Sequence, residues 1–571
     1  MNQRKAFIET NNFPVALISQ ASAKEKGPGR PGYWDMVFWW TRKPLASARA
    51  VIAGCLLPAD TDPKNFIKAL GLDQKNPHKC NPTLPKEWQQ YFQEKKLLDP
   101  FAGFGSIPLE ALRLGLSVRA VELLPTAYVF LKAVLEYPLK YGVQLVKDVE
   151  KWGNWITGQL RQDPLIRELY DDNVAVYIGS WEVKCPHCKN WTPLVGNHWL
   201  SRVKNSEGEY DSVVWFEYEK RGNELSESII DLKSKFKNLH GLTIIGDRVT
   251  IRDRTLTVPK PNINAKSERA TCLNCGGMIR YFDPQTMKHY LEKKKLPREI
   301  HTRLEWYVRY GLNRFHQGDE SIARQRLLVK VKTVQQKLTF ESCTMEDQAK
   351  LTRAKKEIEK QKGDPDIPYE EFAPYKWRHG NISIWGFHQI RKLFNPKQLL
   401  VLVKLVKLIR EVGREIVREK NCGEYAEAIT TYLAIALARY ANYNSLCTVW
   451  NAGAQLPAQV AHTLSMRGIA MMWNWGEVSP FAEMSGTGSW VKNLSSALNR
   501  SLNYLTRLHN YHGQQNFSST SATSEGEIVV VVDDATTLAK LDQDVRFDLV
   551  VTDPPYYDDV MYTELSDFYY V

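Results

Sequence analysis

The stretch that decides the fold is KLLDPFAGFGSIPLEALRLG, residues 96–115. Its apolar start predicts a short strand, its glycines predict a loop, and its remainder predicts a helix. Gly103 and Gly105 lie where the strand must turn sharply and where a ligand can approach a backbone without Cβ atoms. The stretch is therefore typical of a strand–loop–helix unit that holds a cofactor at its turn.

A second strand and helix follow directly, in SVRAVELLPTAYVFLKAVLEYP. The strand is expected to end at Glu122, 17 residues beyond Gly105. In nucleotide-binding α/β folds, an acid at the end of the second strand accepts hydrogen bonds from ribose hydroxyls. The glycine loop, this acid and the strand–helix alternation together indicate a nucleotide-type cofactor site. A plain strand–turn–helix that binds nothing is the alternative.

The C-terminal residues extend the pattern with two strands, at 528–532 and 547–552. Both are nearly continuous in Val, Ile and Leu, as buried parallel strands are. The first runs into the acidic turn Asp533–Asp534, and the second ends in Asp553-Pro554-Pro555-Tyr556. Open α/β sheets bind ligands at the carboxyl ends of their strands. We therefore expect Gly103, Glu122, Asp534 and Asp553 to meet at one edge of one sheet.

Composition places the chain among globular proteins. Its 571 residues, 43% hydrophobic and 25% charged, suffice for two to four domains. The net charge of +12 and the pI near 9.0 favour a polyanionic partner. The longest apolar runs are too short to span a membrane, and the N-terminus lacks a secretory signal. A cytoplasmic location is therefore expected.

Four of the nine cysteines form two C-x-x-C pairs, Cys185/Cys188 and Cys272/Cys275. Disulfides are not expected in a chain without a secretion signal. Two such knuckles supply the four thiolates of one tetrahedral zinc ion. The 83 residues between the pairs must then loop out as an insertion. Two unrelated pairs of free thiols are the alternative.

The motifs DPFAGFG and DPPY together resemble the signatures of the amino-group DNA methyltransferases, which methylate N6 of adenine or N4 of cytosine. The whole layout is similar to the large adenine-specific DNA methylases that contain a zinc ribbon and begin with a domain of unknown function. The residues that carry this wider likeness are FWWTRKPLASARAVIAGCLLP at 38–58, the two C-x-x-C pairs, LFNPKQLLVL at 393–402 and MMWNWGEVSPF at 471–481. The resemblance implies an α/β fold: a Rossmann-like, S-adenosylmethionine-dependent methyltransferase sheet interrupted by a long mixed α/β insertion with a zinc ribbon.

The resemblance also implies roles for individual residues. Asp99, Phe101, Gly103 and Gly105 would surround the methionine end of S-adenosylmethionine, Glu122 would hold the ribose, and Asp534 or its neighbour Asp533 would face the adenine amino group. Phe104 departs from the small residues that many family members have in this loop.

At the other loop, Asp553 and the Pro554 carbonyl would accept hydrogen bonds from the target amino group, Pro554 and Pro555 would stiffen the chain, and Tyr556 would stack on the extruded base. Double-stranded DNA is the expected partner.

The sequence predicts the following organisation along the chain: a helical segment leading into the cofactor site at 1–60, the first part of the methyltransferase sheet at 61–180, the zinc-ribbon insertion at 181–285, a mostly helical insertion with possible DNA recognition at 286–515, a linker at 516–527, and a shortened second part of the sheet at 528–571. Within it, the charged stretch 321–363 is expected to be mostly helical, as a solvated hairpin or a phosphate-tracking arm. Residues 396–420 are expected to form an amphipathic helix.

Three other functions remain open from the sequence. One is methylation of cytosine N4, and one is methylation of RNA or of a protein amide, for which Asp553 is the less usual residue. The third is a zinc-ribbon DNA-binding protein whose methylase-like sheet is only a scaffold. Because few residues follow Asp553, we also expect a separate polypeptide, or residues beyond this frame, to complete the sheet.

Overall fold

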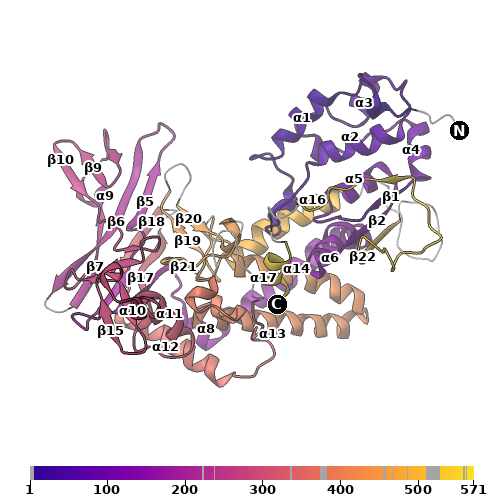
Figure 1. Ribbon diagram of the computed structural model, residues 1–571. Coiled ribbons are helices and arrows are strands. Elements are labelled where there is room, and N and C mark those ends of the chain that lie inside the picture. Colours follow the sequence, from indigo (N-terminus) through magenta and orange to yellow (C-terminus); the bar gives the residue numbers. More distant parts are fainter. Residues whose placement is uncertain are drawn as a thin grey trace. The chain divides into compact units, whose positions relative to one another are not determined.

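The strands that follow from the glycine-loop stretch and from the C-terminal residues form one four-stranded parallel sheet (Figure 1). Its order is β22-β2-β1-β23, and every neighbouring pair is parallel. The strands are β1 (Lys96–Asp99), β2 (Ser117–Glu122), β22 (Ile528–Val532) and β23 (Leu549–Val550). Both strands predicted near the C-terminus therefore join the sheet that begins with the glycine loop.

The outer strands of this sheet are less buried than their apolar sequences predict. Every residue of β22 is half-buried, and Val550 in β23 is 57% exposed. The inner strands carry the core instead, with Leu97, Val118 and Ala120 fully buried. The sequence pattern alone does not reveal that β22 and β23 are the outermost of the described strands.

The computed structural model describes residues 5–221, 224–236, 238–334, 337–372, 382–453, 458–466, 468–484, 486–509, 527–556, 560 and 562–571. The chain divides into two compact units. Unit 1 comprises residues 1–156, 408–438 and 493–570, and unit 2 comprises residues 157–407, 439–492 and 571. Each unit is described by itself.

Helix α5 (Ser106–Leu114) covers the centre of the unit 1 sheet, and all nine of its residues are buried. Gly105 (φ +80°) precedes it and Gly115 (φ +95°) follows it. The left-handed backbone at Gly105 favours glycine. A Cβ atom there would also lie 3.2 Å from Leu131 Cδ2. Gly105 is thus required both by the turn and by the helix packed against it.

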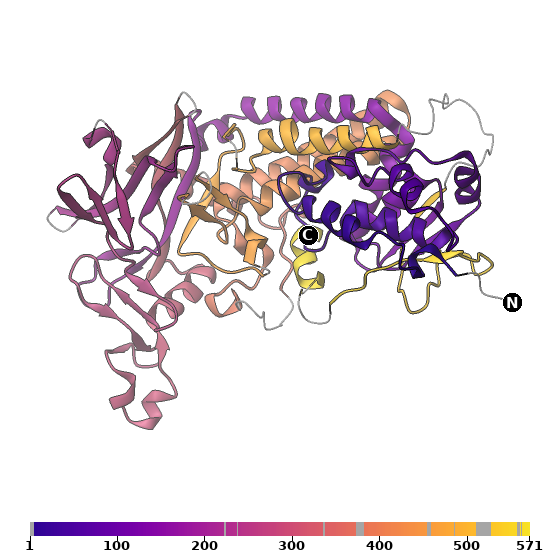
Figure 2. The same cartoon turned by 90° about the horizontal axis from the view of Figure 1, so that it is seen from above.

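The remaining helices of unit 1 come from both ends of the chain, and Figure 2 shows the yellow C-terminal stretch beside the indigo N-terminal one. They are α1 (Val15–Lys24), α2 (Leu45–Leu56), α3 (Pro63–Ala69), α4 (Lys86–Gln93), α6 (Pro125–Leu131), α16 (Asn499–His509) and α17 (Tyr562–Tyr570), with the short helices η1 (Phe7–Glu9), η2 (Gly32–Asp35), η3 (Pro77–Lys79), η4 (Lys132–Glu136) and η9 (Asn493–Leu498). Three longer helices contribute residues to both units: α7 (Tyr137–Gln162), α13 (Pro396–Lys420) and α14 (Gly423–Asn442).

Unit 2 is organised around an antiparallel sheet of order β18-β17-β3-β21, with β4 paired to β3. Its strands are β3 (Val174–Lys184), β4 (Trp191–Leu194), β17 (Ala323–Val334), β18 (Lys337–Ser342) and β21 (Asn474–Val478). Strand β3 is buried along ten of its eleven residues. At Gly179 a Cβ atom would lie only 2.2 Å from the Trp475 ring, so glycine lets the two strands pack.

Smaller antiparallel sheets extend unit 2. Their strands are β5 (Trp199–Lys204), β6 (Tyr210–Arg221), β7 (Glu224–Asp231), β8 (Thr243–Ile245), β9 (Arg248–Ile251), β10 (Arg254–Thr257), β11 (Ile263–Asn264), β12 (Arg269–Thr271), β13 (Met278–Ile279), β14 (Tyr281–Asp283), β15 (Lys288–Tyr290), β16 (Glu305–Trp306), β19 (Val449–Asn451) and β20 (Gln459–Ala461). Sheets β5-β6-β7 and β10-β9-β8 share a core that includes Trp215, Leu232 and Val249.

The helices of unit 2 are short apart from α11 and α12. They are α8 (Pro164–Leu169), α9 (Leu232–Lys235), α10 (Arg298–His301), α11 (Tyr307–His316), α12 (Met345–Lys360) and α15 (Trp490–Lys492), with η5 (Lys293–Lys295), η6 (Ile382–Trp385), η7 (Ile390–Leu393) and η8 (Thr463–Met466). Across the described ranges, no helix has the length and hydropathy that crossing a bilayer requires.

The prediction of a mostly helical stretch at 321–363 is wrong for its first half. Residues 323–342 form the hairpin of β17 and β18, because LLVKVKTV is rich in β-branched residues and β17 pairs with the buried strand β3 in the same sheet. Helix α12 then begins at a capping box between Thr344 and Asp347. The amphipathic helix predicted at 396–420 is confirmed as α13. The predicted linker at 516–527 lies outside the described residues except for Glu527.

Candidate functional site

The glycine loop after β1 is held by its own backbone. Gly105 N donates to the Ala102 carbonyl oxygen at 2.8 Å, and Phe101 N donates to Asp99 Oδ1 at 3.2 Å. Gly103 has φ +54°, which favours glycine, and a Cβ atom there would lie 3.9 Å from Trp39 Nε1. At the carboxyl end of β1, Phe101 is 37% exposed and Gly103 is half-buried, whereas Gly105 is buried.

Glu122, at the end of β2, fixes this loop. Its Oε2 accepts a hydrogen bond from Gly103 N at 2.8 Å, and its Oε1 accepts one from Leu123 N at 3.0 Å. Burial raises the pKa of Glu122, although these backbone hydrogen bonds partly oppose the rise. Backbone N–H groups of Gly103, Leu123 and Leu124 take three of the roughly four acceptor positions of this carboxylate, so about one remains for a ligand.

Asp99 connects the glycine loop to the loop after β23. Its side chain hydrogen-bonds to Thr552, the residue directly before Asp553. Burial raises the pKa of Asp99 to about 7, and the nearby Glu122 carboxylate contributes to the rise. Asp99 is only 1% exposed. The two loops that the sequence singles out thus lie side by side, at the carboxyl ends of neighbouring strands.

In the Asp553–Tyr556 loop, the Asp553 carboxylate is paired with a lysine from the N-terminal segment. Lys43 Nζ forms an ion pair with Asp553 Oδ2 and also contacts the Tyr556 hydroxyl. That hydroxyl donates to Asp553 Oδ2 at 3.2 Å, and Lys43 Nζ lies 4.7 Å from the centroid of the Tyr556 ring. Pro554 and Pro555 are exposed, and Tyr556 is 48% exposed. The ring is therefore available to a planar ligand.

Glu25 positions the segment that carries Lys43. Helix α2 begins after Pro44, and Glu25 accepts hydrogen bonds from Leu45 N at 2.7 Å and Ala46 N at 2.9 Å. These are two of the free N–H groups that every helix start leaves. Burial raises the pKa of Glu25 to about 7. The segment is also held from α17, since the Tyr562 hydroxyl donates to Thr41 Oγ1 at 3.0 Å.

Phe104, the departure from the family pattern, does not lie in the exposed part of the loop. It is 2% exposed, and its ring stacks on Tyr33 with centroids 5.6 Å apart and planes 6° apart. The Arg42 guanidinium lies 5.1 Å from the same ring, and burial lowers the pKa of Arg42 to about 10. A bulky residue fits here because its ring packs into the aromatic core of unit 1.

The two acids after β22 differ in what they can contact. Asp533 is buried and accepts hydrogen bonds from Asp534 N at 2.8 Å and Lys540 N at 2.6 Å, so it holds the turn. Asp534 is exposed, and its Oδ1 accepts from Thr536 N at 2.8 Å. That backbone hydrogen bond lowers the pKa of Asp534. Of the two, Asp534 is the acid that a ligand can reach.

The sequence reasoning missed two residues of this site, Lys43 and Thr552. Lys43 lies inside the quoted segment FWWTRKPLASARA, where a cation next to an aromatic run was the available signal. Thr552 gave the weaker signal of a hydroxyl directly before an acid. Both become visible only when the N-terminal segment and β23 are placed against β1.

A second candidate site lies in unit 2, where Cys185, Cys188, Cys272 and Cys275 converge. Their sulfur atoms all lie within 4.8 Å of one another. The Sγ atoms of Cys185 and Cys275 are 3.9 Å apart, and those of Cys188 and Cys272 are 3.7 Å apart. Four sulfurs placed about 2.3 Å from a central zinc ion in a tetrahedron lie about 3.8 Å apart. The donor set and spacing therefore fit one structural zinc ion.

The two knuckles have the same backbone pattern. Cys185 N donates to the Asn190 carbonyl and Lys189 N to the Cys185 carbonyl, at 2.8 and 3.0 Å. Cys272 N donates to the Gly277 carbonyl and Gly276 N to the Cys272 carbonyl, both at 2.9 Å. The equivalent residues Lys189 and Gly276 both have a left-handed backbone, with φ of 62° and 71°. This repeated geometry favours a built metal site over two unrelated pairs of thiols.

Residues 12–78 match the model of a family described as a protein of unknown function, DUF1156. The match includes α1, α2, α3 and Lys43. No curated protein matches the chain, and no solved structure does. The expected N-terminal domain of unknown function is thus confirmed, and the wider resemblance to the methylases stays a prediction.

Proposed function

We propose that unit 1 transfers the methyl group of S-adenosylmethionine to N6 of adenine in DNA. The observation that carries the proposal is the contact between the glycine loop and the Asp553–Tyr556 loop through Asp99 and Thr552. A cofactor in the first loop and an amino group in the second would then meet at one edge of the sheet.

The strand order supports this placement. Numbered along the chain, the four strands of the unit 1 sheet lie in the order third, second, first, fourth. This is how a doubly wound sheet of order 3-2-1-4-5-6 begins, and such sheets bind ligands where the order reverses. In this chain the reversal falls between β1 and β23, which the two loops follow.

The cofactor would lie across the ends of β1, β2 and β22. Exposed Phe101, with Gly103 and Gly105, which place no Cβ atoms in the turn, suits the methionine end of the cofactor. The remaining acceptor position of Glu122 suits a ribose hydroxyl, and exposed Asp534 suits the adenine amino group.

An exocyclic amino group is a poor nucleophile because its lone pair is delocalised into the ring. The site must therefore make this nitrogen more nucleophilic. Asp553 and the Pro554 carbonyl would each accept one amino hydrogen and so favour a pyramidal nitrogen. Its lone pair would then point at the sulfonium methyl group. As the N–C bond formed, the C–S bond would break, S-adenosylhomocysteine would leave, and the surplus amino proton would pass to Asp553 or to water. This would be catalysis by positioning and electrostatics. The base must leave the duplex to reach this loop, and the exposed face of Tyr556 offers a stacking surface.

Lys43 has a defined place in this proposal. Its ammonium group holds Asp553 Oδ2 in the absence of a base. An incoming amino group that bonds to this oxygen would compete with Lys43 for it. Burial lowers the pKa of Lys43.

The test is methyl transfer by the full chain. We would incubate it with radiolabelled S-adenosylmethionine and mixed-sequence double-stranded DNA, then digest the DNA to nucleosides. N6-methyladenine that disappears in Asp553→Ala supports the proposal. If the label appeared instead in N4-methylcytosine, in RNA or in protein, the substrate would be cytosine, RNA or protein and not adenine in DNA. If calorimetry showed no binding of S-adenosylmethionine, the sheet would be only a scaffold and the proposal would be overturned.

A further inference from the structure

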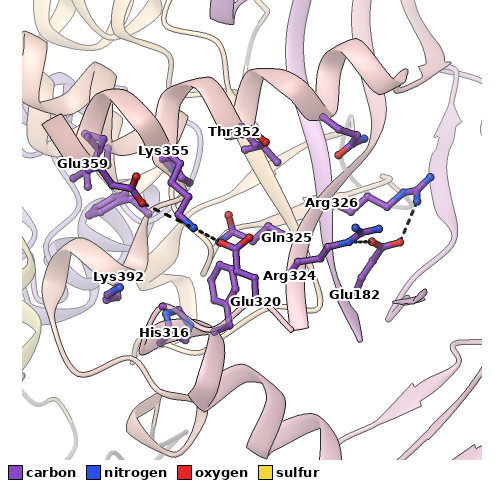
Figure 3. Close-up of a pocket in the computed structure, with 18 of the residues that line it drawn as sticks. Glu182, His316, Glu320, Arg324, Gln325, Arg326, Thr352, Lys355, Glu359 and Lys392 are labelled. Atoms are coloured by element: carbon purple, nitrogen blue, oxygen red, sulfur yellow. Dashed lines mark hydrogen bonds and ion pairs between the residues drawn. The ribbon is translucent and has the colours of Figure 1, made fainter. Parts of the chain in front are cut away.

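Unit 2 contains a cavity of about 480 Å³ that lies apart from the cysteine cluster (Figure 3). It is bounded by α12, β17, the end of α11 and η7. Its volume falls within the range of small-ligand sites in proteins, which is roughly 300–1,000 Å³. The cavity is therefore large enough for a nucleotide-sized molecule.

Charged side chains line this cavity unevenly. Its described lining contains five cations and three carboxylates: Arg324, Arg326, Lys355, Arg391 and Lys392 against Glu182, Glu320 and Glu359. Glu182 pairs with both Arg324 at 2.7 Å and Arg326 at 3.0 Å, and Lys355 pairs with Glu320 at 2.6 Å. Figure 3 shows these pairs around the wall. Arg326 also pairs with Glu227 at 2.9 Å, just outside the lining. Arg391 and Lys392 are the lining cations for which the described residues supply no carboxylate.

Among the cations of the lining, Lys392 has the environment that most favours binding of an anion. Among the described residues, no carboxylate lies within ion-pair distance of it. Its charged neighbours are Arg391 and Lys355, which have the same sign. Burial, together with these two cations, lowers the pKa of Lys392 to about 8. A ligand of negative charge would reverse that effect.

His316 supplies a second, independent sign of a ligand. It is 7% exposed and lines the cavity, yet neither ring nitrogen has a hydrogen-bond partner among the described residues. Its ring packs against Phe387, with centroids 4.3 Å apart. Burial lowers the pKa of His316 to about 3, so the ring is neutral and offers one donor and one acceptor. Buried polar groups without partners are rare in folded proteins.

We propose that this cavity binds a phosphate monoester. A doubly charged phosphate would balance the two unpaired cations, with Lys392 as its counter-ion and His316 as a neutral donor. Lysine binds phosphate as a point charge, so no fork geometry is required. Phe315, Leu351 and Phe394 form an apolar wall for the rest of the ligand. The site lies wholly in unit 2 and does not depend on the proposed methyl transfer.

The test is isothermal titration calorimetry of the full chain with AMP, adenosine and inorganic phosphate. We expect saturable binding of AMP that is at least tenfold tighter than that of adenosine. Lys392→Gln should weaken AMP binding at least tenfold, and Lys392→Arg should restore most of it. Lys362→Gln, which removes an exposed charge just after α12, is the matched control and should change nothing.

Two further experiments identify the source of the phosphate and the location of binding. A short single strand with a 5′-phosphate, compared with its unphosphorylated twin, tests whether a nucleic-acid end is the ligand. Glu122→Ala should leave AMP binding unchanged, which separates this cavity from the proposed cofactor site. Failure of AMP, phosphate and the phosphorylated strand to bind would overturn the proposal, and so would binding that Lys392→Gln does not weaken in a variant with an unchanged melting temperature.

Discussion

Lys397 Nζ lies 2.7 Å from Glu477 Oε1, and neither side chain has any exposed surface. The ammonium group also lies 3.8 Å from the centroid of the Tyr177 ring and 4.5 Å from that of Tyr170. Asn395 Nδ2 donates to the second Glu477 oxygen at 2.5 Å. Two stretches that carry the family resemblance, LFNPKQ and NWGEV, therefore meet in one buried ion pair. Since Lys397 lies in the first turn of α13, where the helix dipole disfavours a cation, Glu477 offsets that cost.

Replacing Lys397 by methionine should destabilise unit 2 by about 3–5 kcal/mol, because it leaves the Glu477 carboxylate buried without its counter-ion. Urea unfolding followed by tryptophan fluorescence measures the change. Lys260→Met is the control, since Lys260 is exposed and 3.7 Å from Asp247, and it should cost less than about 1 kcal/mol. Equal effects of the two substitutions would contradict the prediction.

Asp553→Ala should abolish methyl transfer and leave the affinity for S-adenosylmethionine within about threefold, because the acid is expected to contact the base and not the cofactor. Asp548→Ala provides the matched control. Asp548 lies directly before β23, where it accepts a hydrogen bond from Lys96 N at 2.9 Å, away from the loops. Full activity of Asp553→Ala would remove the proposed catalytic role.

Glu122→Ala should weaken S-adenosylmethionine binding by about 10- to 150-fold, which corresponds to the loss of charged hydrogen bonds worth about 1.5–3 kcal/mol. Calorimetry measures it. Glu122→Gln should lose less, since its amide oxygen can still accept from Gly103 N. Glu527→Ala, at an exposed residue just before β22, is the control. An unchanged affinity in Glu122→Ala would show that the ribose lies elsewhere.

Cys185→Ser should reduce zinc from one ion per chain to a small fraction of that and destabilise unit 2, because a structural zinc ion contributes folding free energy directly. Elemental analysis of the purified protein gives the stoichiometry. Cys422→Ser, outside the cluster, should keep the full amount. Protein without zinc, whose four clustered thiols titrate freely, would exclude the metal site.

Asp99→Asn should flatten the dependence of unit 1 stability on pH. The pKa of Asp99 is raised from 3.8 to about 7, so the folded state binds the proton more tightly than the unfolded chain. Its contribution therefore becomes less favourable as the pH rises through this range, and the full penalty is present above about pH 7. The substitution should stabilise the unit at pH 8, by an amount on the order of 3 kcal/mol, and have little effect at pH 4.

Urea unfolding at several pH values checks this prediction. Asp548→Asn should follow the profile of the unmodified chain, because Asp548 is partly exposed at the opposite end of its strand. Parallel profiles for Asp99→Asn and the unmodified chain would mean that Asp99 keeps its ordinary pKa.

Local patterns predicted the parts of the fold that depend on local physics. The glycine loop, the strand ending at Glu122, helix 396–420 and the cysteine knuckles each carry their signal within a few residues. The hairpin at 323–342 was missed because its many lysines and arginines resemble a solvated helix when its buried partner strand is unknown.

The candidate site could be predicted only in part for the same reason. Asp99, Glu122 and Asp553 follow strands, and the rule for parallel sheets brings strand ends together. Lys43 comes from a segment that follows no strand, and its contact with Asp553 spans 510 residues of chain. No periodicity encodes such a contact. It follows from packing α2 and α17 around the sheet, which only the structure provides.

The paired knuckles also bear on how unit 2 can vary. Residues 189–271 leave the first knuckle and return to the second, carrying sheets β5-β6-β7 and β10-β9-β8 with a core of their own. Closing a loop twice as long costs only about 0.6 kcal/mol more. One ion would clamp both ends of this excursion, and β4 and Glu227 of β7 tie its base to the sheet beneath. Variation in length is therefore expected in its outer part, the sheet β10-β9-β8. The knuckles would thus hold the base of the excursion in place while its outer strands and turns vary.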